Sequence, residues 1–235
     1  MLAAAPKHHL NRFASSRELA DALADTVSDR LRAAISHRGK ALIAVSGGTT
    51  PGLFFRTLSS RDLDWAKVTV TLVDERFVPA SSPRSNAALV AENLLQNNAA
   101  AANFAGLYRP TETAEEAASQ ADDELQALAW PLDVAILGMG GDGHTASFFP
   151  DAEGLDRLLD PSSDRTVLPV SAPSAGEPRL TMTLPRLAGA GFVALHIEGN
   201  AKRDVLDKAL QPGSHLPVRA VFDHSRQPVE IFWAP

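Results

Sequence analysis

The sequence predicts an α/β fold: a doubly wound, mostly parallel, Rossmann-like sheet with helices on both faces, in a single domain over residues 1–235. Short apolar runs suited to buried strands alternate with segments of helical periodicity, and this alternation implies right-handed parallel crossovers. Several of the strands lead directly into glycine-rich or charged loops. No internal repeat or long linker divides the chain, and its 45% hydrophobic content is enough for one large core.

The first half of the chain contains clear helix and strand signals. Leucine, valine and isoleucine recur every four residues between Arg17 and Arg38, with Gly39 as a natural stop. Pro51 suits the first turn of a helix, and the segment from Thr113 has the form of a capping box. The predicted elements are a helix at 17–38, a strand at 41–45, a helix from Pro51, a strand at 68–73, and helices at 87–95 and 113–128.

The second half continues the alternation. A central apolar run precedes a glycine-rich loop, and later β-branched and apolar runs are typical of strands. We expect strands at 132–137, 166–170, 191–197 and 229–233, the last closing the sheet as an edge strand, and a helix from about 201 to 210.

Composition excludes several classes of protein. The formal net charge of −6 argues against a nucleic-acid binder, which normally carries a basic face. There is no cysteine, hence no disulfide or thiolate chemistry, which fits a cytoplasmic protein. Residues 1–13 do not have the pattern of a signal peptide, and no apolar run is long enough to predict a membrane span.

The stretch from Leu132 to Pro150 carries the main signal for a functional site. Its apolar strand ends in four glycines within six positions, 138–143, and His144 follows at once. Glycines there permit close approach of a ligand to the backbone, at the edge where open α/β sheets bind ligands. The loop also matches G-x-G-x-x-G, but a dinucleotide site needs a helix that starts in the loop, and Pro150 leaves room only for a short one.

His144 is the candidate general acid/base, because imidazole titrates near neutral pH. The alternative is a histidine that only hydrogen-bonds a turn. The strand at 68–73 runs into Asp74-Glu75-Arg76, which places charge at the same sheet edge. We expect Asp74 to orient or charge-balance His144 and Arg76 to stabilise an anion; the alternative is simply solvated charge.

A small anion cradle is predicted at Ser46-Gly47-Gly48-Thr49-Thr50, where backbone N–H groups and hydroxyls precede a helix. It is not a Walker loop, and a plain tight turn is the alternative. Arg179 and Lys202 offer cations to complete a phosphate site, although either alone is commonly a surface charge.

Two other chemistries fit the sequence less well. Ser46, Asp74 and His144 fall in the chain order of an α/β-hydrolase triad, but Ala44 replaces the first glycine of the nucleophile elbow. A metal site is not expected, because the histidines and carboxylates lack a recognised ligand spacing.

Taken together, six motifs resemble those of 6-phosphogluconolactonases and cover nearly the whole chain in order. They are SGGTTP at 46–51, DERFV at 74–78, SPRSN at 82–86, GMGGDGHTASFFP at 138–150, PRLTMTLP at 178–185 and EGNAKRDVL at 198–206. The wider superfamily includes glucosamine-6-phosphate isomerase/deaminases. Those enzymes typically have tyrosine where Arg76 stands and an acidic residue in an Asn-Glu-Pro run where this chain reads Phe148-Phe149-Pro150.

The resemblance implies hydrolysis of 6-phospho-D-glucono-1,5-lactone to 6-phospho-D-gluconate, the second step of the oxidative pentose phosphate pathway, without a cofactor. It implies catalytic roles for His144, Asp74 and Arg76. Residues implied to bind substrate or its phosphate are Ser46, Gly47, Gly48, Thr49, Arg84, Asn86, Gly140, Gly141, Arg179 and Lys202.

The expected mechanism is direct water attack assisted by His144, with the oxyanion held by backbone N–H groups near Gly140 and Gly141 or by Arg76. The expected partner is a sugar-phosphate lactone, not nucleic acid or membrane, for a cytoplasmic monomer or homodimer. The alternatives are a glucosamine-6-phosphate isomerase/deaminase and, from another class, a non-catalytic sugar-phosphate sensor.

Overall fold

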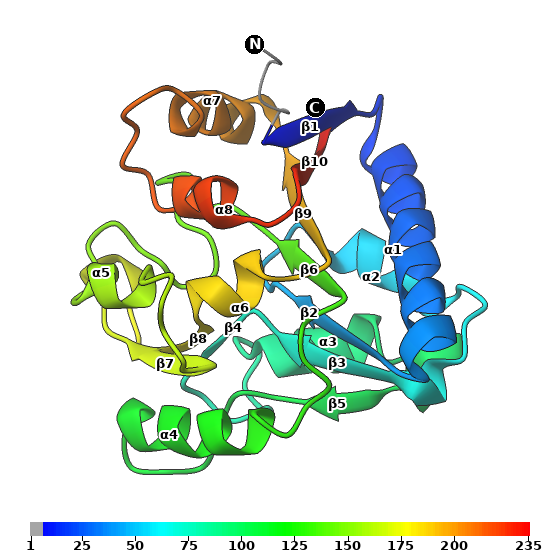
Figure 1. Cartoon of the computed structure of the whole chain (residues 1–235), viewed down its shortest axis with the longest axis horizontal. Coiled ribbons are helices and arrows are strands. Elements are labelled where there is room, and N and C mark those ends of the chain that lie inside the picture. Colours follow the sequence, from blue (N-terminus) through cyan, green and yellow to red (C-terminus); the bar gives the residue numbers. More distant parts are fainter. Residues whose placement is uncertain (1–6) are drawn as a thin grey trace.

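The computed structural model describes residues 7–235, so the expectation about a signal peptide lies partly outside the described residues. Within them, one seven-stranded sheet forms the centre of the molecule (Figure 1), and every neighbouring pair of its strands is parallel. Its spatial order is β1 (His8–Arg12), β10 (Val229–Ala234), β9 (Phe192–Glu198), β6 (Val134–Leu137), β2 (Ala41–Val45), β3 (Val68–Leu72) and β5 (Asn103–Ala105).

Helices and short turns connect these strands. The described helices are α1 (Ser16–Arg38), α2 (Gly52–Ser59), α3 (Asn86–Asn93), α4 (Ala114–Leu125), α5 (Leu155–Leu158), α6 (Leu184–Ala188), α7 (Asn200–Ala209) and α8 (Val218–His224), with 3₁₀ turns at Trp65–Lys67, Asn97–Ala101 and Pro173–Ala175. Helices α1 and α2 pack against each other, as do α6 and α8, and the two pairs lie on opposite sides of the strands in Figure 1. The doubly wound prediction is therefore confirmed.

Local signals explain where the helices begin and end. The Ser15 hydroxyl accepts a hydrogen bond from the Glu18 N–H at the start of α1, and Gly39 ends it at φ 73°. Glycine tolerates this left-handed conformation without steric cost. The predicted Thr113 cap is confirmed, since its hydroxyl accepts from the Glu116 N–H, although α4 stops at Leu125 instead of near 128. No described helix is long and apolar enough to cross a membrane.

One sequence prediction about strands was wrong, and one predicted strand lies in a second sheet. Val229–Ala234 is not an edge strand, because β1 pairs outside it, and the edges of the described sheet are β1 and β5. Strand 166–170 exists as β7 (Val167–Val170), but it does not join the main sheet. It belongs to a three-stranded antiparallel sheet with β8 (Arg179–Met182) and β4 (Asp74–Arg76), so the charged residues after β3 form a strand of their own.

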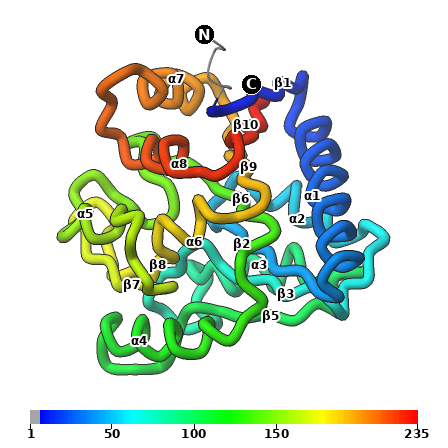
Figure 2. The backbone as a smooth tube through the Cα atoms, in the orientation of Figure 1, coloured from blue at the N-terminus to red at the C-terminus, as the bar shows by residue number. Residues whose placement is uncertain are grey.

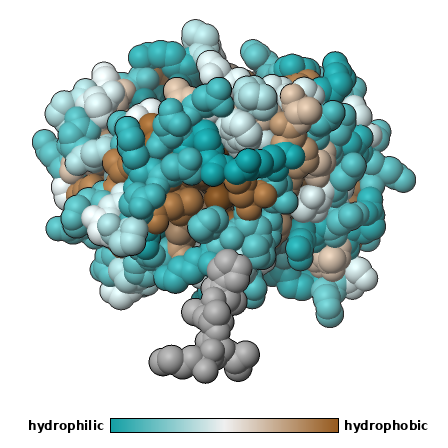
Figure 3. Space-filling model, turned by 90° about the horizontal axis from the view of Figure 1, so that it is seen from above, coloured by the Kyte–Doolittle hydropathy of each residue, from teal (hydrophilic) through white to brown (hydrophobic). Residues whose placement is uncertain are grey.

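The core lies along the central strands, where every residue of β2 and β6 is buried. From β2 the chain moves outward through β3, whereas from β6 it moves the other way through β9 and β10, so the winding reverses between β2 and β6. Open α/β sheets bind ligands in the crevice at such a reversal. The two glycine-rich loops leave the sheet here (Figure 2). The face seen in Figure 3 is mostly hydrophilic, with a strip of hydrophobic atoms across its middle.

Candidate active site

A pocket of about 210 Å³ opens at the carboxyl ends of the central strands. Its walls come from the loops after β2 and β6, from β4 and β8 of the small sheet, from the first residue of α3, and from β9 and α7. The lining residues are Ser46, Gly47, Gly48, Thr49, Thr50, Pro51, Asp74, Arg76, Asn86, Gly138, Met139, Gly140, His144, Ala146, Arg179, His196 and Lys202.

His144 lies at the mouth of this pocket, and its partner is Asp142. The Nδ1–H of His144 donates to Asp142 Oδ1 at 2.5 Å, and the same oxygen accepts the His144 backbone N–H at 3.1 Å. Because a carboxylate only accepts, this bond places the proton on Nδ1 and leaves Nε2 as the basic nitrogen. The ring also packs against Phe149, with centroids 4.3 Å apart. The prediction that Asp74 holds the imidazole was wrong.

The glycines of the loop make room for this imidazole. The N–H of Gly140 donates to the carbonyl of His144 at 2.9 Å, which closes the turn. A Cβ at position 140 would lie 2.2 Å from Cε1 of His144, so only glycine fits there with the ring in place. The same N–H is therefore already occupied and is not free to bind a substrate oxyanion.

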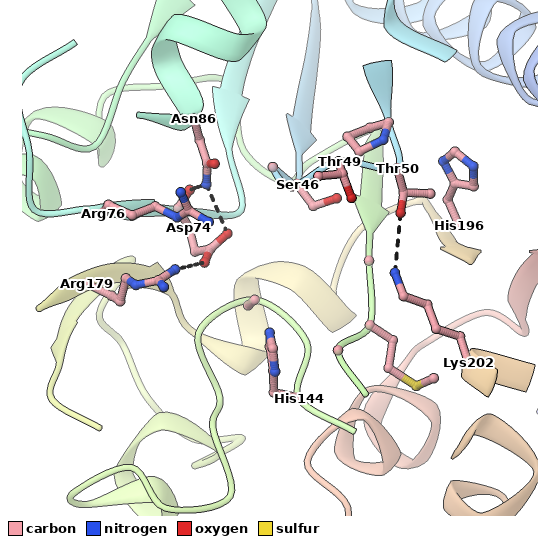
Figure 4. A pocket seen from close by; sticks show the side chains of 17 residues that line it. Ser46, Thr49, Thr50, Asp74, Arg76, Asn86, His144, Arg179, His196 and Lys202 are labelled. Carbon is pink, nitrogen blue, oxygen red and sulfur yellow. Dashed lines mark hydrogen bonds and ion pairs between the residues drawn. The ribbon is translucent and has the colours of Figure 1, made fainter. Parts of the chain in front are cut away.

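Asp74 instead belongs to a buried network across the pocket (Figure 4). Its Oδ2 accepts the hydroxyl of Ser147 at 2.6 Å. The side-chain amide of Asn86 donates to the Asp74 carbonyl at 2.8 Å and lies 3.5 Å from Oδ1. Only 7% of Asp74 is exposed, so these partners fix a carboxylate that has little access to solvent. A Cβ on Gly47 would overlap the Asn86 amide, at 1.8 Å, which explains the glycine there.

Two arginines lie beside this carboxylate. Antiparallel pairing of β4 with β8 sets Arg76 opposite Arg179, and Arg179 Nη1 is 4.0 Å from Asp74 Oδ2. Burial lowers the pKa of Arg179, while Asp74 opposes the change. The Nε atoms of both arginines are buried without a hydrogen-bond partner among the described residues. Buried donors are normally paired, so this side of the pocket is suited to an anionic group of a ligand.

The predicted anion cradle forms the opposite side of the pocket (Figure 4). Gly48 has φ 94°, which turns the loop before α2. The ammonium of Lys202, in the first turn of α7, donates to Thr50 Oγ1 at 3.3 Å. Burial lowers the pKa of Lys202 and the charge of Glu198 raises it, with burial the larger effect. Lys202 makes no ion pair among the described residues, which leaves its charge available for a ligand.

Most of the predicted residues meet in this pocket, but Arg84 and Gly141 do not line it. Arg84 instead pairs with Glu177 at 2.6 Å, and only its backbone carbonyl approaches the site, where it accepts from Arg76 Nη1. The sequence analysis missed Asp142 as the imidazole partner, Ser147 as the partner of Asp74, and His196. The position of Asp142, two residues before His144, was the available signal.

The other chemistries find no support in this geometry. No helix starts between residues 138 and 154, so the glycine loop lacks the helix that a pyrophosphate site requires. The hydroxyl of Ser46 makes no hydrogen bond to His144, although a nucleophile and its base need that contact. Among residues 7–235, no group of three or more His, Cys, Asp or Glu side chains is arranged to hold a metal ion.

Known proteins are similar to this chain along nearly its full length. The family model described as glucosamine-6-phosphate isomerases/6-phosphogluconolactonase matches residues 14–233. A 6-phosphogluconolactonase of Mesorhizobium japonicum is 61% identical over 97% of this chain and 96% of the relative. One of Pseudomonas aeruginosa is 46% identical over 96% and 94%. The crystal structure of a 6-phosphogluconolactonase from Shewanella baltica superposes with a TM-score of 0.94 at 36% identity, covering 97% of this chain and 98% of that one.

Proposed function

This chain belongs to the glucosamine-6-phosphate isomerase/6-phosphogluconolactonase family, and on that premise we propose that it hydrolyses 6-phospho-D-glucono-1,5-lactone to 6-phospho-D-gluconate. The observation that carries the proposal is the pairing of His144 with Asp142 at the mouth of a pocket with cationic groups on two sides. A lactone with a phosphate at one end and a carbonyl at the other needs one anion site for each, with a base between them.

In the proposed binding mode the phosphate lies in the loop of Ser46 to Thr50 and pairs with Lys202. Backbone N–H groups at the start of a helix and one ammonium are the usual partners of a phosphate. The sugar then extends toward His144. Arg179, expected from sequence to help bind the phosphate, lies beside Asp74 on the other side of the pocket, so we assign it to the lactone end.

Hydrolysis then follows in two proton transfers. Nε2 of His144 accepts a proton from water as the water oxygen attacks the carbonyl carbon, and the C1 oxygen becomes an oxyanion. When the C1–ring oxygen bond breaks, the imidazolium returns the proton to the leaving ring oxygen. Asp142 keeps the ring oriented and balances its transient positive charge, and the C1 acid formed ionises to the carboxylate.

The two arginines are the best-placed donors for stabilising the oxyanion. Arg76 and Arg179 each present a buried Nε–H without a partner among the described residues, whereas the Gly140 N–H is used within its own loop. Preorganised donors of this kind stabilise charge that develops in the transition state. The charge of Asp74 helps to keep the Arg179 guanidinium in place, and the hydrogen bond from Ser147 fixes the Asp74 carboxylate.

The isomerase/deaminase alternative is disfavoured by what surrounds His144. Where those enzymes carry a carboxylate after the histidine loop, this chain has Phe148 and Phe149, which are 0% and 4% exposed. Phe149 packs against the imidazole and beneath the Arg179 guanidinium, 5.5 Å from its ring centroid. No acid is therefore present at that position to move the protons of sugar-ring opening.

The decisive assay follows freshly generated 6-phosphogluconolactone against its spontaneous hydrolysis, with glucosamine-6-phosphate in parallel. Acceleration of the lactone alone supports the proposal, activity on the amino sugar alone supports the isomerase, and binding without turnover supports the sensor. Ser46→Ala should lower activity only in part, as expected for a phosphate contact. Loss of nearly all activity would instead indicate a covalent serine nucleophile.

We extend the proposal to a cytoplasmic enzyme that acts as a monomer or homodimer. Its substrate is a phosphorylated sugar, which carries charge and stays in the compartment where it is made. Cell fractionation and sedimentation velocity test the two statements separately.

A further inference from the structure

A second histidine, His196 on β9, lines the pocket and has no part in the mechanism above (Figure 4). Only 3% of it is exposed. Its Nε2–H donates to Glu198 Oε1 at 3.0 Å, and its Nδ1 is buried without a partner among the described residues. A buried imidazole that spends its hydrogen bond on one carboxylate fixes the position of that carboxylate.

Glu198, at the end of β9, is held from both sides. Its Oε2 accepts the hydroxyl of Ser16, the first residue of α1, at 2.5 Å. The hydrogen bonds from His196 and Ser16 lower the pKa of Glu198 below its ordinary value, against the effect of burial, so it is ionised at neutral pH. Both carboxylate oxygens are thus engaged by hydrogen-bond donors.

Lys202 lies four residues further on, and Glu198 is the carboxylate that raises its pKa against burial. The two do not form an ion pair: Lys202 donates only to Thr50 Oγ1. The neighbouring Arg203 pairs with Asp207, and the other charged or titratable groups of the pocket, Asp74, Arg76, Arg179 and His144, line its other walls. Glu198 therefore supports the charge of Lys202 without occupying its ammonium.

We propose that His196 and Ser16 hold Glu198 as a fixed counter-charge for Lys202, so that the Lys202 ammonium stays unpaired and free to bind the phosphate of the substrate. The three are positioning residues, since none needs to touch the reacting atoms. The inference rests on the proposed function only for the identity of the phosphate-bearing ligand.

The first experiment measures the pKa of the Lys202 ammonium directly, by NMR titration of the ¹³Cε-labelled full chain, with Lys202→Met to assign the resonance. Glu198→Gln removes the counter-charge and should lower this pKa by roughly half a unit or more. His196→Phe removes the donor, lets Glu198 pair with Lys202 directly, and should raise the pKa. Unchanged values in both variants, or shifts of the same sign, would overturn the proposal.

The chain provides a matched control. Glu230 on β10 also accepts from a histidine, His9, at 2.7 Å, but lies outside the pocket. Glu230→Gln should leave the Lys202 pKa unchanged. If His196→Phe does not fold, Ser16→Ala removes the other donor at a helix start and should raise the pKa in the same way.

The second readout is kinetic. His196→Phe should raise KM for the lactone at least about threefold with little change in kcat, because the ammonium is now paired. His196→Gln, which keeps a donor to Glu198, should have a KM close to that of the wild type. The double variant His196→Phe/Glu198→Gln should also return KM toward the wild-type value. A fall in kcat alone would contradict the assignment. If the wild-type chain turns over no lactone, the proposed function fails, whereas the NMR titration still decides this inference.

Discussion

Gly140→Ala tests the geometry of the catalytic loop at a single atom. The residue lies outside the left-handed region, so alanine is compatible with its backbone conformation. The added Cβ would lie 2.2 Å from Cε1 of His144, 2.3 Å from its Nδ1, and 2.7 Å from Oδ1 of Asp142. The three nearest heavy atoms to the added Cβ therefore all belong to the imidazole and its partner.

The size of the effect follows from these distances. Restoring ordinary contact, at 3.4 Å or more, requires the ring to move by about 1.2 Å. A displacement of ~1 Å at a catalytic group costs about 100-fold in rate, which corresponds to ~2.7 kcal/mol in the activation free energy. We expect kcat to fall at least that far, while KM stays within about threefold because the phosphate end is untouched.

The assay is steady-state hydrolysis of the lactone, corrected for its spontaneous rate, with thermal unfolding measured alongside. Gly141→Ala is the control, since a Cβ there has no heavy atom within 4 Å. His144→Ala and the double variant complete the set: once the imidazole is gone, Gly140→Ala should have no further effect on kcat. Near-wild-type turnover by Gly140→Ala would refute the assigned position of His144.

Three further variants separate the roles of the other groups. Asp142→Asn removes the carboxylate that holds Nδ1 of His144, so kcat should fall roughly 100-fold or more with KM preserved; a wild-type pH–rate profile would contradict this. Lys202→Met should raise KM about 10- to 100-fold through loss of a charge-assisted bond, with kcat retained. Burial lowers the pKa of Lys202, so its positive charge reduces the stability of the folded protein. As pH rises from this lowered pKa toward 10.5, folded Lys202 loses its proton first and the stability of the wild type increases. Thermal melts should show that Lys202→Met is at least as stable as the wild type at pH 7 and lacks this increase in stability with pH. Arg84→Ala should change kcat/KM less than about threefold, since the guanidinium pairs with Glu177 and only the retained backbone carbonyl reaches the site.

The parts of the fold that sequence predicted are those with strong local patterns. Helix α1 repeats apolar residues on one face between clear caps, and β2 and β6 are continuous apolar runs. Strand β1 gives no such signal, because His8–Arg12 is polar and only its pairing with β10 makes it a strand. Without β1, nothing in the sequence shows that β10 lies inside the sheet.

The candidate site, too, was predictable only where the local sequence pattern is strong. Glycine-rich turns after strands marked both loops, and Lys202 and Asp74 follow strands that end at one edge. The partner of His144 was not predictable from the expectation that side chains at the carboxyl ends of neighbouring strands meet, because that expectation favoured Asp74. It depends on how the turn folds back, with Gly143 at φ 80° and the Gly140 N–H on the carbonyl of His144, and this brings Asp142 to the ring. Arg84 was misplaced because its loop neighbour Asn86 enters the pocket while its own side chain finds Glu177 outside.

The small antiparallel sheet separates one set of pocket residues from the rest of the site, and this separation has a consequence for how the family can evolve. In the proposed binding mode the phosphate is held by the loop after β2 and the start of α7, both attached to the main sheet, whereas Asp74, Arg76 and Arg179 lie on strands of the small antiparallel sheet. Under this proposal, mutations within β4 and β8 change the groups that face C1 of the sugar and leave the phosphate contacts unchanged. One scaffold can then keep its class of substrate and exchange its reaction, and the family that contains this chain names both isomerases and lactonases.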